Sequence, residues 1–466
     1  MENCEPLAWY GALVLVVMGG FILVPFLRGK SDLISAWNIF LFGIAVFIGL
    51  GCFEAATSPI RFQGLQWFQP TKGEVLWYIA ATTIFLVTLF LSHYFDPVSR
   101  AIAARSFNNW PPISTGLILY VLFVSLLFIV GFHLFGTIPA VGQVFAKLNH
   151  KAIVFIPVFS FVLWYQSKRN ILWFSLFAVA FVGTLLLAIS SGGGRRMPLS
   201  VLLGPVFVLY LAQFRHWRPA KSIVVMGALC FAIFVALIVY SSVRHVRDRS
   251  RDIRGETEGR ATVVLKRGLD AIAEGNWSER FISNKLFFFS QQNVHYSLIT
   301  DRFVSTGELQ AKPLNTLVFM AVYPIPRQFY PEKTRGLGEA ILREALNCPT
   351  SSWGPGISGH AAYEGGLFVA ALYAYLAAAG IRLIDDPLQR QPTNPFLIAI
   401  LVTSSTHILS WARGDIFNLT VETAQAVLFA YVLAVGGRLL FGTEKAAPRS
   451  PATRPTLAFP IRAHVR

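Results

Sequence analysis

The stretch ILWFSLFAVAFVGTLLLAIS, residues 171–190, decides the fold class. It carries no charged side chain, and about 20 consecutive apolar residues are enough to cross a ~30 Å hydrocarbon core as a helix. Similar apolar runs recur along the 466-residue chain, in which 54% of residues are hydrophobic and only 14% are charged. Soluble domains contain about 25% charged residues. The sequence therefore predicts an all-α, polytopic integral membrane protein.

The apolar runs predict about eleven transmembrane helices, within a range of about 10–13. They lie near residues 8–27, 33–53, 75–95, 113–135, 152–166, 171–190, 197–214, 222–243, 361–383, 394–411 and 416–440. This order gives an N-terminal transmembrane bundle (1–243), a large polar loop with interfacial segments (244–360), C-terminal transmembrane helices (361–441) and a basic tail (442–466). Residues 314–326 are apolar but short and broken by prolines, so we expect them to lie at the membrane interface.

The distribution of basic residues predicts the orientation. Loops rich in Lys and Arg face the cytoplasm, and the richer set includes the loops with Arg28, Arg100 and Arg215 and the C-terminal tail. The N-terminus and the segment 244–360 are then expected outside, and the C-terminus inside. This bias accounts for most of the net charge of +16 without nucleic acid as a partner.

A glycine-rich turn on the outer side, SGGGRRMPLS (191–200), is the first candidate site. Glycines let backbone N–H groups approach a ligand closely, and Arg196 opens the next helix, where the helix dipole adds positive potential. Guanidinium groups suit phosphate oxygens, so Arg195 and Arg196 are candidate pyrophosphate ligands. The alternative is a flexible turn whose arginines contact lipid headgroups.

A proline-rich segment, YPIPRQFYPEKTRGLGE (323–339), forms a second basic cluster on the same side. Its prolines and aromatic residues predict a stiff, amphipathic surface, from which Arg327, Lys333 and Arg335 project. The alternative is an interfacial segment that binds anionic lipid.

The segment WGPGISGHAAYEGG (353–366) leads into a late span and carries His360 and Glu364. These two are four residues apart, hence on one helical face. Burial at a helix mouth can raise the pKa of a carboxyl group, and either side chain could act as a general base. The alternative is a hydrogen-bonded helix entry whose glycines permit tight packing.

A short outer turn, WARGDIF (411–417), places Arg413 and Asp415 between two spans, with His407 and Glu422 in the flanking helices. It can be a self-paired hairpin or a fourth part of the same charged site.

These segments, in this order, resemble the Wzy-type O-antigen and oligosaccharide repeat-unit polymerases of bacterial envelopes. The resemblance is carried by SSGGGRRMPLS, YPIPRQFYPEK, GISGHAAYEGGLFVAALYAYLAAAGIRL and WARGDIF, and it covers roughly residues 185–440. The first segment is similar to the family's Ser-Gly-x-Arg-Arg turn, and the second to its periplasmic Pro-Arg-x-x-x-Pro-x-Lys stretch. The N-terminal spans match only in hydropathy.

The resemblance implies a multi-pass enzyme of the bacterial inner membrane that transfers a growing glycan from undecaprenyl pyrophosphate to a lipid-linked repeat unit at the periplasmic face. Its partners would be the lipid-linked oligosaccharide, membrane lipids and a chain-length regulator protein. The sequence shows no carboxylate cluster for a metal, so we expect neither metal nor cofactor. Glu364 or His360 would act as the general base. The remaining site residues divide into pyrophosphate ligands (Arg195, Arg196, Arg327, Lys333 and Arg413) and sugar-binding residues (Tyr323, Tyr330, Trp353, Tyr363 and Asp415).

Other readings stay open at this stage. An O-antigen ligase shares the multispan design and the outer arginines. A flippase or exporter would place ionisable groups near mid-membrane and show internal repeats. A metal-dependent lipid-sugar glycosyltransferase would need acidic ligands in the first outer loop, where Glu54 has no aspartate partner. A structural assembly partner is the residual option.

Overall fold

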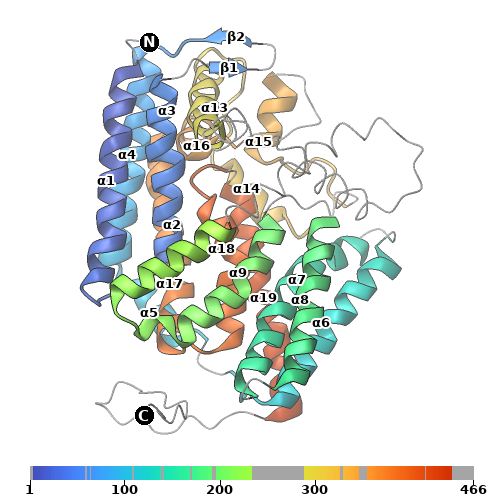
Figure 1. Cartoon of the computed structure of the whole chain (residues 1–466). Helices are drawn as coiled ribbons and strands as arrows, with labels where there is room; N and C mark the ends of the chain where they lie inside the picture. Colours follow the sequence, from blue (N-terminus) through green and yellow to red (C-terminus); the bar gives the residue numbers. More distant parts are fainter. Residues whose placement is uncertain are drawn as a thin grey trace, which may run out of the picture.

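A computed structural model describes residues 4–57, 60–62, 65–107, 110–136, 138, 141–167, 170–190, 196–233, 288–325, 329–345, 354–414 and 416–442. Within these residues the fold is helical, apart from one antiparallel hairpin of β1 (Ile60–Phe62) and β2 (Leu65–Phe68) (Figure 1). The predicted all-α membrane architecture is confirmed.

Eight helical segments of the described chain are long and apolar enough to cross a membrane. They are α1 (Glu5–Leu27), the continuous run of α2 (Ala36–Ile44), η2 (Ala45–Leu50) and α3 (Gly51–Thr57), α4 (Lys72–Phe95), α6 (Thr115–Phe135), α7 (Val141–Gln166), α8 (Ile171–Ser190), α17 (Leu367–Arg390) and α19 (Ile416–Phe441). Three shorter apolar helices are α9 (Arg196–Ala212), Pro219–Ile233 and α18 (Pro395–Leu409). Each predicted span overlaps one of these helices.

The boundary predicted at residue 361 is wrong. The span expected from residue 361 begins at Leu367, and the residues before it form a separate short helix, α16 (Gly356–Glu364). Gly365 and Gly366 separate the two helices with φ angles of 136° and 74°, a region of backbone conformation that L side chains rarely adopt. The break turns α16 away from the span that follows it.

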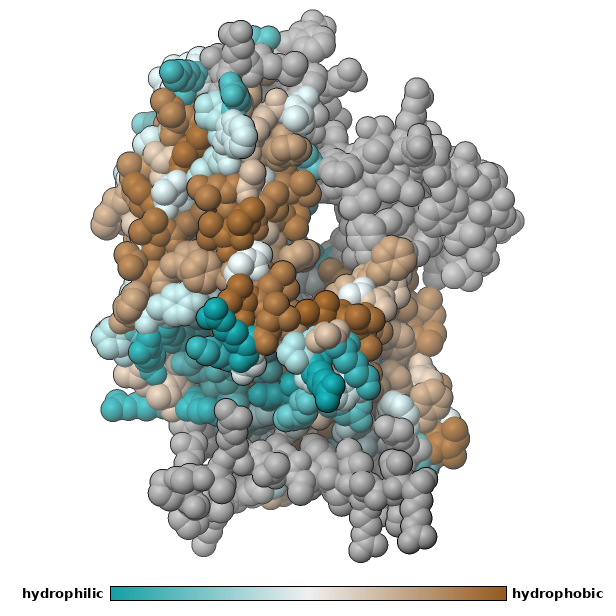
Figure 2. Space-filling view, turned by 60° about the vertical axis from the view of Figure 1, so that its left-hand side comes forward, coloured by the Kyte–Doolittle hydropathy of each residue, from teal (hydrophilic) through white to brown (hydrophobic). Residues whose placement is uncertain are grey.

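The spans differ in how much of their surface the protein covers. Helix α18 packs against α2, α7, α9, α17 and α19, so its side chains from Pro395 to Thr406 are all buried. Only 11% of the most apolar stretch of α8 is buried inside the protein, whereas 78% of the corresponding stretch of α7 is buried. Figure 2 shows hydrophobic residues covering the middle of one face, with hydrophilic residues gathered below them. This pattern fits a lipid-facing belt with a polar rim.

The two ends of the helix bundle are distinct (Figure 1). One end, here called the α16 end, carries the N-terminus and the short helices between Phe288 and Glu364; the other, the α5 end, carries α5 (Pro97–Arg105) and the end of α17. Arg390 fastens α17 to α5 by donating to the carbonyl oxygens of Ala103 at 2.6 Å and Ala104 at 2.5 Å. Because successive spans alternate in direction, the start of α9 and the turn between α18 and α19 both lie at the α16 end.

Short helices form a cap over the α16 end. They are α13 (Phe288–Ser305), α14 (Asn315–Val322), α15 (Leu337–Ala340), η5 (Ile341–Ala345) and α16. The short helix η3 (Phe214–His216) is separate from this cap and follows the end of α9. With 8 residues, α14 is about 12 Å long and cannot span a membrane, as expected for residues 314–326.

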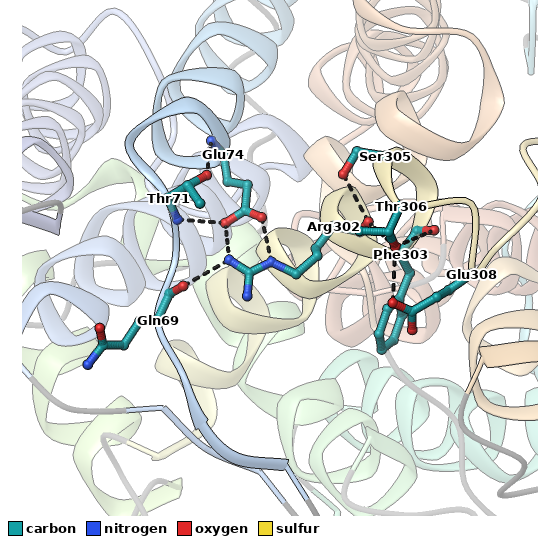
Figure 3. A network of polar contacts seen from close by, with 8 residues as sticks. All are labelled: Gln69, Thr71, Glu74, Arg302, Phe303, Ser305, Thr306 and Glu308. Carbon is teal, nitrogen blue, oxygen red and sulfur yellow. Dashed lines mark hydrogen bonds and ion pairs between the residues drawn. The ribbon is translucent and has the colours of Figure 1, made fainter.

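An arginine fork ties the cap to the bundle (Figure 3). Arg302 of α13 donates from Nε and Nη2 to the two carboxylate oxygens of Glu74, at 2.6 and 2.7 Å. Glu74 also closes a capping box with Thr71 at the start of α4. The carboxylate therefore serves two elements at once, and it holds the last turn of α13 against the start of α4.

Candidate functional site

Two polar clusters lie at the α16 end, and the first is the predicted pair His360 and Glu364. Both side chains are fully buried, and Nδ1 of His360 lies 2.7 Å from Oε1 of Glu364. The spacing of four residues therefore does place them on one face of a helix, as predicted.

Neither member of this pair is left short of hydrogen bonds. The Glu364 carboxylate accepts from the backbone N–H of Thr316 at 2.9 Å, from its hydroxyl at 2.6 Å, and from the hydroxyl of Tyr373. The backbone N–H of Ile416 lies 3.4 Å from Nε2 of His360. The pair thus joins α16 to α14, α17 and the start of α19, which is what a buried structural network does.

The electrostatics of Glu364 differ from the sequence-based expectation. Burial tends to raise the pKa of this carboxyl group, but the neighbouring His360 and the hydrogen bonds from Thr316 and Tyr373 outweigh it, so the pKa lies below its ordinary value. The expected rise is wrong because the carboxylate is buried among donors rather than among apolar groups.

The second cluster gathers around Glu422, near the start of α19. We call Lys147, Lys151, Arg196, His407 and Glu422 the Glu422 cluster. The ammonium group of Lys151 contacts the Glu422 carboxylate directly, and that of Lys147 lies 3.8 Å from it. Arg196 and His407 both interact electrostatically with Glu422. Two lysines therefore meet at one carboxylate, and Arg196 interacts with it electrostatically.

Exposure varies within this cluster. The side chain of Lys147 is 46% exposed and that of Glu422 is 17% exposed, whereas Lys151 is only 2% exposed. The cluster thus has an open side at Lys147 and a closed side at Lys151. Lys147 can therefore contact a ligand from the exposed side, while the surrounding protein holds Lys151 in place.

Two polar atoms at the cluster lack hydrogen-bond partners within the described residues. They are Nδ1 of His407 and Oε1 of Gln425, and both are buried. Gln425 lies one helical turn after Glu422 on α19. Because buried polar groups are nearly always hydrogen-bonded, such atoms mark a place prepared for a bound molecule or water.

Four helices bring the cluster together from distant parts of the sequence. Lys147 and Lys151 come from α7, Arg196 from the first residue of α9, His407 from α18 and Glu422 from α19. Helices α9 and α18 pack against each other, and the hydroxyl groups of Ser200 and Thr406 meet at 3.2 Å.

Two of the helices that form the cluster are short for membrane spans. Helix α18 has 15 residues and α9 has 17, so they are about 22 and 26 Å long, shorter than a ~30 Å hydrocarbon core. His407 and Arg196 stand at their α16 ends. Ionisable groups on membrane helices are costly and are kept for function.

Lys333 and Tyr323 lie beside the cluster, in different roles. Lys333 is buried, and its ammonium group donates to the carbonyl oxygens of Tyr323 at 2.7 Å and Ile325 at 3.1 Å. It therefore fixes the chain at this point. The Lys147 ammonium group stands 5.8 Å from the centre of the Tyr323 ring, which places Tyr323 at the open side of the Glu422 cluster.

The other predicted site residues are scattered or undescribed. The Arg413 guanidinium lies 5.6 Å from the ring centre of Phe47, Tyr363 is fully buried and Tyr330 is 39% exposed. Arg195, Arg327, Trp353 and Asp415 fall outside the described residues. Of the predicted pyrophosphate ligands, Arg196 is thus the one found in the Glu422 cluster.

Sequence reasoning placed His407 and Glu422 in the helices beside the outer turn 411–417, but it did not join them to Lys147 and Lys151. The contact between Lys151 and Glu422 joins residues 271 positions apart, so no local spacing in the sequence predicts it. A usable signal is present, however: each of the four is ionisable and lies near the same end of an apolar helix. No group of three or more His, Cys, Asp or Glu side chains suited to a metal occurs in the described part of the chain.

Comparisons with protein-family models, with curated proteins and with solved structures find no significant match to this chain.

Proposed function

We propose that this protein transfers a glycan from a lipid diphosphate carrier to a lipid-linked repeat unit, as a polymerase on the extracytoplasmic side of a bacterial inner membrane. The observation that carries the proposal is the Glu422 cluster, in which Lys147 and Lys151 pair with a single carboxylate and Arg196 interacts with it electrostatically. Such a set of charges suits a diphosphate group better than any neutral ligand.

The depth of the cluster favours a lipid-borne diphosphate over a soluble one. Helices α9 and α18 are shorter than a full hydrocarbon core, and we propose that the cations at their α16 ends lie at about the level of lipid headgroups. A carrier lipid anchored in the bilayer presents its diphosphate at that level.

The proposed reaction assigns a task to each member of the cluster. The bond between the anomeric carbon and the carrier diphosphate breaks, and the acceptor hydroxyl oxygen forms a new glycosidic bond to that carbon. The diphosphate leaves with added negative charge, which Arg196, Lys147 and Lys151 would stabilise. The hydroxyl proton would pass to Nδ1 of His407, which is unpaired among the described residues.

The general base is the point where this proposal departs from the sequence-based prediction. Glu364 or His360 as the base stays a prediction, but the polar atoms of both are already hydrogen-bonded within the protein. We therefore propose His407 as the base, and Glu364 and His360 as residues that position α16. Tyr323, beside Lys147, would contact a sugar ring, and the roles of Arg195, Arg327, Arg413, Tyr330, Trp353, Tyr363 and Asp415 stay predictions.

The test is complementation of a host strain that lacks this gene. With Arg196→Gln we expect about 100-fold less polymer, the usual cost of removing one transition-state donor, and accumulation of lipid-linked single units. The matched control is Arg343→Gln, which removes an arginine that is 43% exposed and paired on the cap. Normal polymer with Arg196→Gln, at equal protein level in the membrane, would overturn the proposal.

The same strain separates the polymerase from a ligase or a flippase. Without a polymerase, one repeat unit still reaches the final acceptor. Without a ligase, no unit reaches it. Without a flippase, the lipid-linked unit stays on the cytoplasmic side, where it is protected from periplasmic enzymes.

A further inference from the structure

We propose that Lys333 is a positioning residue, which holds the Tyr323 ring beside Lys147 so that the ring binds the sugar next to the carrier diphosphate. This inference rests on the proposed function, because it concerns the sugar of the proposed lipid-linked substrate. It differs from the sequence-based prediction, in which Lys333 binds the pyrophosphate itself. The chemical group that Tyr323 would bind is the apolar face of a pyranose ring, which packs against aromatic side chains.

Helix α14 and its C-cap residue present two aromatic rings on one side. Phe319 and Tyr323 are four residues apart, hence on one helical face, and their ring centres lie 6.1 Å apart in an edge-to-face arrangement. The ammonium group of Lys147 stands 5.8 Å from the centre of the Tyr323 ring. This face of α14 is therefore turned toward the open side of the Glu422 cluster.

Charged side chains from other segments fix α14 at both of its ends. A helix of 8 residues is marginal by itself, and the N-cap residue of α14 makes no side-chain hydrogen bond to it. Instead, the Glu364 carboxylate accepts from the backbone N–H of Thr316 at 2.9 Å. At the other end, Lys333 donates to the carbonyl oxygens of Tyr323 at 2.7 Å and Ile325 at 3.1 Å. The helix dipole favours an anion at the first end and a cation at the second.

The prolines that follow α14 explain why a lysine is needed at its end. Pro324 and Pro326 have no backbone N–H and cannot continue the helix, so the last carbonyl oxygens need a donor from elsewhere. Lys333 is only 8% exposed, and its ammonium group lies 4.9 Å from the centre of the Tyr323 ring and 5.6 Å from that of Phe319. A buried ammonium group that donates to two carbonyl oxygens is suited to hold the chain in place.

The place of the Tyr323 ring suits a sugar that is attached to a diphosphate. In the proposed complex Lys147 contacts the diphosphate, and the ring stands next to that ammonium group. An aromatic wall that is already fixed loses little conformational freedom when a ligand binds. A ring on a frayed helix end would have to be ordered first, at a cost in affinity. Lys333 would thus increase the affinity for the sugar without contacting the substrate.

The experiment compares two dissociation constants for the purified full-length protein in uncharged detergent. One probe is geranyl diphosphate esterified to a single glucose, and the other is the methyl ester of geranyl diphosphate, so both carry two negative charges. For the unaltered protein we expect the glucose ester to bind about fivefold more tightly, the contribution of one aromatic packing contact. Lys333→Met and Tyr323→Leu should each reduce that ratio to near unity.

A double variant tests whether Lys333 acts through Tyr323. Lys333→Met combined with Tyr323→Leu should lower the ratio no further than Tyr323→Leu alone, whereas two independent contributions would add and make the glucose ester the weaker ligand. Lys333→Arg keeps the charge and the donors, so it should recover most of the ratio. The matched control is Lys312→Met, which removes a lysine that is 43% exposed on the cap and should leave the ratio unchanged. If Lys333→Met does not fold, Lys333→Gln, which retains an amide donor for one carbonyl oxygen, gives the same test.

The outcomes separate this inference from the proposed function. If the lysine variants weaken both probes by the same factor, Lys333 binds the diphosphate and the positioning role is wrong. It is also wrong if those variants leave both dissociation constants unchanged. If the unaltered protein binds the two probes equally, the sugar contact fails and the diphosphate site of the proposed function stands. If the unaltered protein binds neither probe, both proposals fail.

Discussion

The two polar clusters at the α16 end are built from similar residues and yet differ in how completely they are satisfied. On α16, His360 and Glu364 are fully buried and each has hydrogen-bond partners from other elements. In the Glu422 cluster, Lys147 and Lys151 share one carboxylate, and Nδ1 of His407 is unpaired within the described residues. The first arrangement holds helices together, whereas the second leaves capacity for a ligand.

This comparison shows that burial and charge alone do not identify a functional site. Glu364 is the more deeply buried carboxylate, but its donors keep its pKa below the ordinary value and occupy its oxygens. By contrast, the groups around the Glu422 carboxylate are mainly cations, Lys147 and Lys151, rather than neutral hydrogen-bond donors. An excess of charge of one sign is therefore the better indicator of an anion site.

The largest expected effect comes from removing Glu364. Glu364→Leu leaves the donors of Thr316 and Tyr373 and the ring of His360 without a buried acceptor, so we expect a loss of about 3–5 kcal/mol in the free energy of unfolding. The thermal midpoint in detergent measures this change. The polymer made per folded molecule should fall by no more than a few-fold. A normal midpoint with no polymer would make Glu364 catalytic and would break the comparison.

A pH effect of intermediate size is expected from His295 on α13, in the cap. Burial lowers its pKa to about 3, whereas the unfolded chain titrates near 6.5. The unfolded state therefore binds the proton more tightly, so stability is complete above pH ~6.5 and is lost as the pH falls, by about 2 kcal/mol between pH 6.5 and pH 5. Thermal midpoints across this range should fall less steeply for His295→Gln; equal slopes for the two proteins would show that other groups cause the loss.

The membrane spans could be predicted from the sequence because hydropathy is a local property. Each predicted apolar run overlaps a helix, as α8 does over Ile171–Ser190. The pairing of His360 with Glu364 was also local, since it follows from a spacing of four residues. The break at Gly365 and Gly366 was missed because adjacent glycines occur both inside membrane helices and at their ends.

The Glu422 cluster was not predictable by the same means. It depends on how α7, α9, α18 and α19 pack, and Lys151 and Glu422 are 271 positions apart. Arg196 was identified because its glycine-rich neighbourhood is a local feature. Lys147 and Lys151 have no such local feature beside them.

Lys147 offers a smaller test, at the open side of the Glu422 cluster. Because its side chain is 46% exposed, Lys147→Gln should leave the thermal midpoint unchanged and weaken binding of a prenyl diphosphate sugar about tenfold, the effect of one charge-assisted contact. The matched control is Lys312→Gln, since Lys312 is 43% exposed and paired with Glu344 on the cap. Equal loss of binding in both variants would mean that general positive charge, rather than this site, attracts the diphosphate.

The smallest effect is expected at Arg335, which belongs to the basic segment 323–339. Its guanidinium donates to Glu339 at 2.6 Å, but both side chains are more than one-third exposed, and Arg343 also contacts Glu339 at 3.1 Å. Removing one of two exposed partners of a carboxylate costs about 0.5 kcal/mol or less. Arg335→Gln should therefore leave both the thermal midpoint and polymer length unchanged. Shorter chains at an unchanged midpoint would place the cap in contact with the substrate, and the division between a structural cap and a ligand-binding Glu422 cluster would then have to be redrawn.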